Sequence, residues 1–264
     1  MKQRIITGVI AGAVFLALLY ISNWTFAFMM SILAFIGYLE YVKLNRMSRK
    51  NPVVWIGAVV LLLMVIPWSL MGLGEVQFLS FVWLLLFLLL GWTVISKNRT
   101  TLDHAALLFA GVVYIGLGFS YMITTRTMEH GLFWTLFVFV CVWSSDSGAY
   151  FSGKAIGRTK LWPEISPNKT IEGSLGGVVW SVVAALLFAY FFPEIVSYGK
   201  AVVLGIVIAV VGQFGDLIQS AYKRIRDVKD TGTLLPGHGG VLDRCDSWMV
   251  VFPFLHLLFL LPGS

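Results

Sequence analysis

Nine runs of about 20 mostly apolar residues follow one another along this chain, and they constrain its fold more than any other feature. An apolar stretch of about 20 residues is long enough to cross a bilayer as an α-helix. The runs cover residues 5–22, 24–42, 52–71, 76–95, 104–124, 132–152, 173–192, 201–221 and 243–261. Charged residues make up only 12% of the 264 residues, against about 25% in a soluble domain. The sequence therefore predicts an all-α, polytopic integral membrane protein and excludes a soluble enzyme.

The basic residues predict how these spans are oriented. If the N-terminus is cytoplasmic, all 19 Lys and Arg residues except Arg126 and Lys200 fall on the cytoplasmic side. Cytoplasmic loops carry an excess of Lys and Arg, so nine spans with the N-terminus inside and the C-terminus outside are expected. The formal net charge of +6 then indicates orientation and anionic membrane lipids as partners, and not nucleic acid.

The two halves of the chain differ in kind. Residues 1–130 contain spans with short connections, and we expect them to form a scaffold. Residues 131–264 contain two long loops, 153–172 and 222–242, which are rich in Gly, Lys, Ser and Asp. Long loops of this kind usually have a specific role. We therefore expect the C-terminal half to be the catalytic region, with both loops in the cytoplasm.

Four aspartates lie within the apolar runs of this half or at their edges. Asp146 and Asp216 lie near the predicted cytoplasmic ends of their spans, and Asp243 and Asp246 lie in the first turns of the last span. A carboxylate in the bilayer costs several kcal/mol unless it faces a cavity, a partner or an ion. Because all three spans meet the cytoplasm at that end, we expect the four acids to surround one polar cavity.

The chemistry of these acids favours a hard metal ion. Carboxylate oxygens suit Mg²⁺ or Mn²⁺, and neighbouring Lys and Arg side chains suit phosphate. We predict that Asp216, Asp243 and Asp246 bind one or two such ions. The alternatives are a structural ion pair for Asp216, helix capping for the other two, and a satisfied helix-end carboxylate for Asp146. The four histidines are scattered, and the two cysteines form no CxxC motif, so zinc is not expected.

The stretch from Ser220 to Asp246 carries the most specific signal. It reads SAYKRIRDVKDTGTLLPGHGGVLDRCD, a glycine-rich loop between a cationic helix end and two acids. Glycine lets backbone N–H groups approach a phosphate closely. The run resembles the signature of the CDP-diacylglycerol synthases, S-x-x-K-R-x4-K-D-x-G-x2-L-P-x-H-G-G-x2-D-R-x-D. A second block, Ser145 to Gly177, resembles the D-x-G-A-Y and S-P-x-K-T-x-E-G stretches of that family.

This resemblance implies a reaction and, with the residue chemistry, a set of site residues. CTP and phosphatidate would give CDP-diacylglycerol and diphosphate, in the inner or plasma membrane with the active site facing the cytoplasm. The residues expected to be catalytic are Asp216, Lys223, Arg224, Asp243 and Asp246. The residues expected to bind substrate are Asp146, Lys154, Ser166, Lys169, Ser220, Lys229, His238, Gly239, Gly240 and Arg244.

Two other functions stay open at this point. A CTP-dependent polyprenol or phytol kinase would use similar metal and phosphate groups but would transfer the γ-phosphoryl group. A cation-coupled transporter would also place acids in its spans, although it would not need long glycine-rich basic loops. No GxxxxGK[ST] motif or dinucleotide-binding fingerprint occurs, so a nucleotide would be bound in another way. Homodimer formation is also left open.

Overall fold

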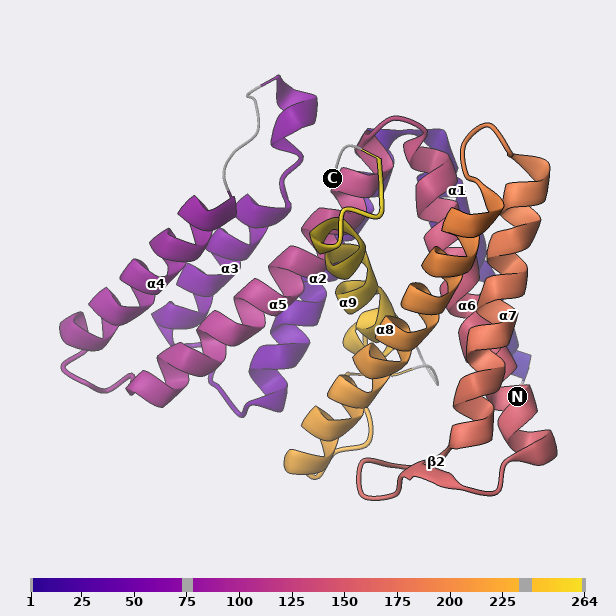
Figure 1. The fold of residues 1–264 in the computed structure, drawn as a ribbon. Helices are drawn as coiled ribbons and strands as arrows, with labels where there is room; N and C mark the ends of the chain where they lie inside the picture. Colours follow the sequence, from indigo (N-terminus) through magenta and orange to yellow (C-terminus); the bar gives the residue numbers. More distant parts are fainter. Residues whose placement is uncertain (1, 73–77, 233–238, 263–264) are drawn as a thin grey trace. The chain divides into compact units, whose positions relative to one another are not determined.

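The chain is almost entirely helical in the computed structural model, which describes residues 2–72, 78–232 and 239–262 (Figure 1). The helices in these ranges are α1 (Lys2–Ile21), α2 (Asn23–Leu44), α3 (Pro52–Val65), α4 (Phe78–Ile95), α5 (Leu102–Thr127), α6 (Gly131–Ile156), α7 (Ile171–Phe191), α8 (Tyr198–Ile225) and α9 (Leu242–Leu257). A short 3-10 helix, η1, spans Trp68–Met71. An antiparallel hairpin of β1 (Lys160–Trp162) and β2 (Ser166–Thr170) lies in the predicted loop 153–172 and was not expected from the sequence.

Six of the described helices, α2, α4, α5, α6, α7 and α8, are long and apolar enough to cross a bilayer. Helix α3 has 14 residues, α9 has 16 with Pro253 inside it, and the stretch of α1 whose side chains are described, Gly8–Ile21, has 14. At 1.5 Å per residue, 14 to 16 residues span roughly 21–24 Å, which is less than the hydrocarbon core of about 30 Å. The expectation of an all-helical integral membrane protein is confirmed, whereas the count of nine spans stays a prediction.

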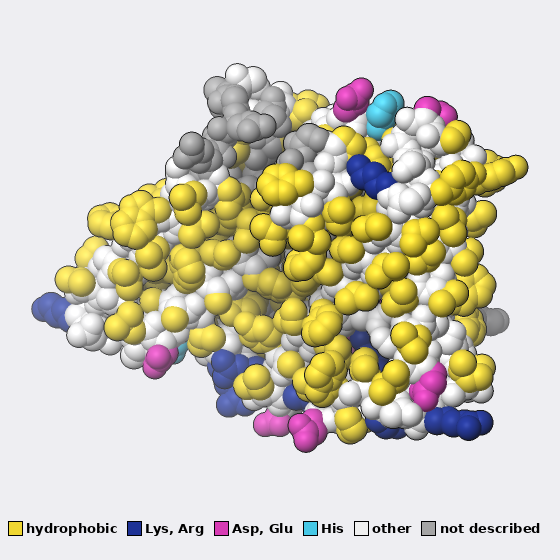
Figure 2. All heavy atoms as spheres, viewed as in Figure 1, with side chains coloured by type: hydrophobic (Ala, Val, Ile, Leu, Met, Phe, Trp, Pro, Cys, Tyr) yellow, Lys and Arg dark blue, Asp and Glu magenta, His cyan; other side chains and the backbone are white. Residues whose placement is uncertain are grey.

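The surfaces of the long helices fit this conclusion. Helix α4 exposes Leu79, Phe87 and Val94 by 73%, 66% and 77%. In Figure 2 hydrophobic side chains cover much of the visible helix surface, and charged side chains gather near helix ends. Apolar surface of this extent is rare on a soluble monomer, and in a bilayer it contacts lipid.

The chain divides into two compact units. The first consists of Met1–Thr127 with Val228–Arg244, and the second of Met128–Asp227 with Cys245–Ser264. The sequence predicts a boundary after residue 130, with residues 131–264 in one region. The structure groups the segment Val228–Arg244, which contains part of the glycine-rich loop, with the N-terminal helices.

In the first unit, α2, α3 and α5 pack against one another, α4 packs on α3 and α5, and α1 packs on α2. The ring of Tyr41 occupies the space beside Gly111, and its hydroxyl donates to the carbonyl of Leu107 at 2.9 Å. The buried guanidinium of Arg126 donates to the carbonyl oxygen of Leu19 at the end of α1. Polar side chains in these helices therefore satisfy backbone carbonyls, as a medium without water requires.

In the second unit, α6 lies along α7 and α7 along α8 (Figure 1). Glycines set the separation of these helices. At Gly148 an added Cβ would collide with the Trp180 side chain of α7. At Gly205 it would lie 2.8 Å from the Cα atom of Val182. Small residues that allow backbones to approach closely are typical of packed membrane helices, and here they let α7 pack closely against α6 and α8.

The close approach at Gly205 predicts a stability difference between two glycine-to-alanine variants. Gly205→Ala should destabilise the protein by about 1–3 kcal/mol, because the backbone of α7 must move to admit the methyl group. Gly91→Ala on α4 is the matched control, since nothing lies within 4 Å of its added Cβ, and it should be neutral or slightly stabilising. Thermal denaturation in detergent, followed by size-exclusion chromatography, measures the difference. Equal melting temperatures would contradict this account of α7–α8 packing.

Candidate active site

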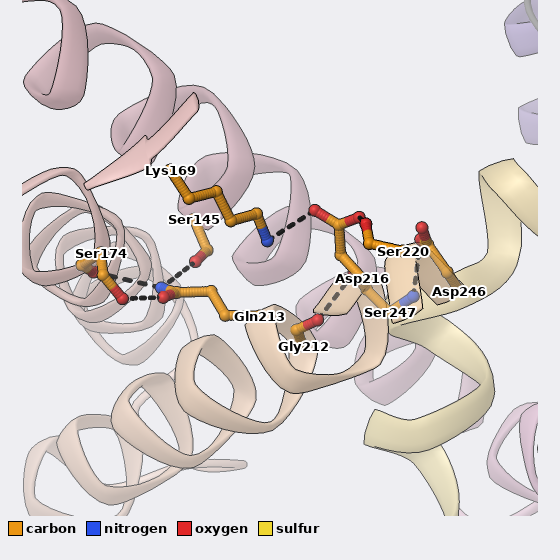
Figure 3. Close-up of polar contacts among 9 residues, drawn as sticks. All are labelled: Ser145, Lys169, Ser174, Gly212, Gln213, Asp216, Ser220, Asp246 and Ser247. Carbon is orange, nitrogen blue, oxygen red and sulfur yellow. Dashed lines mark hydrogen bonds and ion pairs between the residues drawn. The ribbon is translucent and has the colours of Figure 1, made fainter. Parts of the chain in front are cut away.

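Asp216 is the centre of a polar cluster in the second unit (Figure 3). Its Oδ2 atom forms an ion pair with Lys169 Nζ at 2.6 Å, and its Oδ1 atom accepts a hydrogen bond from Ser220 Oγ at 3.4 Å. Ser220 lies four residues after Asp216 on α8, so both side chains share one helix face. Lys169 comes from β2, which means that the pair joins the hairpin to the helix. Both charged side chains are partly exposed, at 27% for Lys169 and 36% for Asp216.

Helix α9 approaches α8 at the same level through two glycines. An added Cβ at Gly215 would lie 2.6 Å from the carbonyl oxygen of Asp246, and the Ser247 hydroxyl donates to the carbonyl oxygen of Gly212 at 3.0 Å. This packing places Asp246 and Ser247 beside the turn of α8 that carries Asp216. The Asp246 carboxylate accepts a hydrogen bond from the Ser247 N–H at 2.7 Å (Figure 3).

Three of the four predicted acids therefore interact within the second unit. Asp146 on α6, Asp216 on α8 and Asp246 on α9 lie close enough for their negative charges to repel one another. Lys169 attracts Asp146, and Lys223 attracts Asp246. Carboxylates held together in this way favour a bound cation, since an added positive charge relieves the repulsion.

The hairpin that carries Lys169 is attached to α8 at two further points. Arg224 Nε donates to the carbonyl oxygen of Ile165 at 3.2 Å, and the ring of Trp162 meets that of Phe214 edge to face at 6.4 Å between centroids. Arg224, which the sequence analysis expected to be catalytic, thus uses its Nε atom to hold the hairpin.

The two ends of the hairpin segment are also fixed. The carboxylate of Glu172, in the first turn of α7, accepts hydrogen bonds from the backbone N–H groups of Arg158 and Thr159 at 3.1 Å. The hydroxyl of Thr170 caps α7 by accepting from the N–H of Gly173 at 3.1 Å. Lys169 is therefore presented by a supported backbone, which suits a residue that must meet a charged group at a fixed place.

Deeper in the second unit, a hydrogen-bonded network joins three helices. Gln213 on α8 accepts a hydrogen bond from the hydroxyl of Ser174 on α7, and its Nε2 atom donates to the Ser174 carbonyl at 3.1 Å (Figure 3). The same Nε2 atom donates to the hydroxyl of Ser145 on α6 at 3.5 Å. Because Gln213 lies one turn before Asp216, this network fixes the helices directly behind the acids.

Asp243 has a different setting, which belongs to the first unit. Its Oδ2 atom accepts hydrogen bonds from the N–H of Thr231 at 2.8 Å, from the Thr231 hydroxyl at 2.9 Å and from the N–H of Gly240 at 3.0 Å. Gly239 has a φ of +80°, and an added Cβ there would lie 2.8 Å from the same carboxylate oxygen. Asp243 therefore organises the described ends of the glycine-rich loop. Its role as a metal ligand stays a prediction.

Glu40 is a buried acid beside the glycine-rich loop that was not identified from the sequence. It lies on α2 with 7% of its surface exposed, and its carboxylate accepts hydrogen bonds from the N–H groups of Val241 and Leu242 at 3.0 and 3.1 Å. The signal that could have found it was present in the sequence. Glu40 is an acid inside the apolar run 24–42, which is the criterion that identified the aspartates.

The remaining predicted residues lie at the ends of elements. Ser166 begins β2 and is partly buried, and Gly240 is buried at the end of the loop before α9. Lys154 on the last turn of α6, Lys229 after α8 and Arg244 on the first turn of α9 are exposed. His238 lies outside the described residues, and its predicted role in the nucleotide loop stays a prediction.

The acids of the second unit fit a magnesium ion that is shared with a phosphate. In the described ranges no group of three or more His, Cys, Asp or Glu side chains is arranged to hold a metal ion. Mg²⁺, however, is usually bound through one or two carboxylates together with waters and substrate phosphates. Asp216 and Asp246 supply hard oxygens of this kind from adjacent helices, and Lys169 shows that a cation is accommodated against Asp216.

The structure is that of a helical membrane protein with acidic and basic side chains gathered around Asp216, an arrangement suited to phosphates. Comparison with known proteins identifies the family to which such a protein belongs. The cytidylyltransferase family matches residues 2–261. The phosphatidate cytidylyltransferase of Bacillus subtilis (strain 168) is 40% identical over 265 residues, covering 99% of this chain and 98% of its own length. Proteins of that name from Staphylococcus haemolyticus and Staphylococcus aureus (strain COL) are each 38% identical over 98% of this chain and 99% of their own. The chain therefore belongs to the cytidylyltransferase family, which confirms the resemblance found in the sequence.

The attachment of the hairpin predicts a local change in Arg224→Ala. Loss of the hydrogen bond to Ile165 should speed amide hydrogen exchange in residues 160–170 by about tenfold, since a hydrogen bond from a charged group is worth about 1.5–3 kcal/mol. Lys229→Ala, which removes an exposed cation just beyond the end of α8, is the control and should leave exchange there unchanged. Hydrogen–deuterium exchange with mass spectrometry measures both. Identical exchange in the two variants would show that Arg224 does not hold the hairpin.

Proposed function

We propose that the protein transfers the cytidylyl group of CTP to phosphatidate, giving CDP-diacylglycerol and diphosphate. The observation that carries this proposal is the similarity, over 98–99% of the chain, to proteins named phosphatidate cytidylyltransferase. The cluster of Asp216, Asp246 and Lys169 supports it, because acids and lysines on membrane helices suit a reaction between a lipid phosphate and a nucleotide. The names of these relatives favour neither a polyprenol kinase nor a transporter.

The proposed reaction asks the protein for position and charge neutralisation more than for proton transfer. A phosphate oxygen of phosphatidate, already anionic, forms a bond to the α-phosphorus of CTP, and the bond from that phosphorus to the bridging oxygen breaks as diphosphate leaves. Asp216 and Asp246 would hold Mg²⁺, which supplies positive charge to the phosphates. Lys169 and Lys223 would bind phosphate oxygens and align the reacting groups.

The other predicted residues complete this proposal. Arg224 would keep the hairpin in place while its remaining N–H groups bind phosphate. Lys229 would bind a nucleotide phosphate, and Asp146 would contact substrate or its water shell. Asp243 would hold the loop that His238, Gly239 and Gly240 form around the nucleotide.

We also infer that the site faces the cytoplasm, in a chain with nine spans and the N-terminus inside. The distribution of Lys and Arg along the sequence supports this orientation. The acids lie near the C-terminal ends of α6 and α8 and near the start of α9, which this topology places on the cytoplasmic side. CTP would then arrive from the cytoplasm, while the acyl chains of phosphatidate stay in the bilayer.

A labelling experiment tests the proposed reaction. Purified protein is incubated with Mg²⁺, phosphatidate in mixed micelles, and CTP labelled at either the α- or the γ-phosphorus. We expect α-label in a cytidine-bearing lipid and γ-label in diphosphate, in equal amounts. Transfer of γ-label to the lipid would indicate a kinase instead. Absence of turnover, together with ion-dependent solute uptake in sealed vesicles, would indicate a transporter.

The proposed metal ligands predict the behaviour of two amide variants. Asp216→Asn and Asp246→Asn should each lower turnover at least about 100-fold, because a ligand is lost where charge develops on the phosphates. Both variants should elute from size-exclusion chromatography like the parent protein. Asp103→Asn, an exposed aspartate on the first turn of α5, is the matched control and should keep its activity. Near-normal turnover of both site variants at limiting Mg²⁺ would refute the assignment.

A further inference from the structure

The carboxylate of Glu40 binds the start of a helix that lies about 200 residues further along the chain. Its Oε1 atom accepts from the N–H of Val241, and its Oε2 atom accepts from the N–H of Leu242, the first residue of α9. The first N–H groups of a helix have no partner within the helix and attract negative charge. Glu40 thus caps α9 from a different helix.

Two glycines of the loop make room for this carboxylate. An added Cβ at Gly232 would lie 2.6 Å from the Cδ atom of Glu40, and at Gly240 it would lie 2.7 Å from the same atom. Neither distance is possible without displacing Glu40. From the sequence, the glycines of this loop are expected to let a phosphate approach the backbone. At these two positions the structure shows a protein carboxylate in the space beside the glycine.

A single hydroxyl links Glu40 to Asp243. Thr231 Oγ1 lies 2.9 Å from Asp243 Oδ2 and 3.4 Å from Glu40 Oε2. The backbone N–H of Thr231 also donates to Asp243. Displacement of the Glu40 carboxylate would therefore shift both Thr231 and the first turn of α9, which carries Asp243.

We propose that Glu40 is a positioning residue for nucleotidyl transfer. It fixes the start of α9 and so the direction of Asp243. The proposal rests on the proposed function, because it assigns Glu40 a part in the same reaction. Burial alone does not account for the arrangement. A buried carboxylate is costly unless it is fully hydrogen-bonded, and here the donors come from the two segments that flank the loop.

Glu40→Gln tests the proposal. The amide group presents N–H donors to backbone N–H donors, so one hydrogen bond at the start of α9 is lost while the size of the side chain is kept. We expect kcat to fall about 10- to 100-fold, as displacement of reacting groups by about 1 Å does. We also expect a higher Mg²⁺ concentration at half-maximal rate and a KM for phosphatidate within about twofold of the parent value. Amide exchange at residues 239–246 should be faster.

Gly232→Ala tests the same contact from the other side with the charge of Glu40 intact. It should reproduce the kinetic changes of Glu40→Gln, and the double variant should be no worse than the poorer single variant, because both act on one contact. It also keeps the proposal testable if Glu40→Gln fails to fold. The controls are Glu129→Gln, which changes an exposed glutamate, and Gly91→Ala, and both should behave like the parent.

The outcomes separate this proposal from simpler ones. A lower melting temperature, with kcat per folded molecule and the Mg²⁺ dependence unchanged, would mean that Glu40 only stabilises the fold, and this would overturn the proposal. Multiplied effects in the double variant would mean that the two residues act independently, which would also overturn it. If the parent protein forms no cytidine-bearing lipid from CTP and phosphatidate, the proposed function fails instead.

Discussion

The cost of a carboxylate in an apolar helix is the constraint on which the rest of this structure depends. Each such acid needs a partner that the bilayer does not provide. Asp216 has Lys169, which the hairpin brings to α8, and Glu40 has the N–H groups at the start of α9. The same requirement therefore fixes the hairpin in the second unit and the ends of the glycine-rich loop in the first.

Close helix packing turns these separate acids into a cluster. Helix α8 presents Gly212 and Gly215 to α9, and the backbone of α9 approaches so closely that an added Cβ at Gly215 would meet Asp246. The adjacent face of α8 carries Asp216, which meets the hairpin. Small residues on one face and polar residues on the next thus let α8 pack against α9 and pair with the hairpin at the same time. The cluster of charged side chains depends on both contacts.

The sequence predicted the helices well and their contacts poorly, for a physical reason. Apolar length predicted α6 and α8 as 132–152 and 201–221, and the structure extends them to Ile156 and Ile225 because helical hydrogen bonding continues into the polar turns that follow the apolar runs. Asp216 and Lys169 were predicted as site residues, and an ion pair was one alternative for Asp216, but Lys169 was not identified as its partner. The partners of Glu40 are backbone N–H groups, which every residue except proline possesses, so nothing in the residue types at 241 and 242 indicates the contact.

The fixed spacing of the signature from Thr231 to Asp246 has a structural explanation beside its chemical one. The Glu40 carboxylate occupies the space in which an added Cβ at Gly232 or Gly240 would lie, and Gly239 adopts a left-handed conformation against Asp243. These restrictions come from contacts inside the protein. A mutation at these positions is therefore expected to change the geometry of the loop and of the start of α9, whatever it does to substrate binding. Such a signature is specific because several of its residues pack against or hydrogen-bond to one another, in addition to any contact with a ligand.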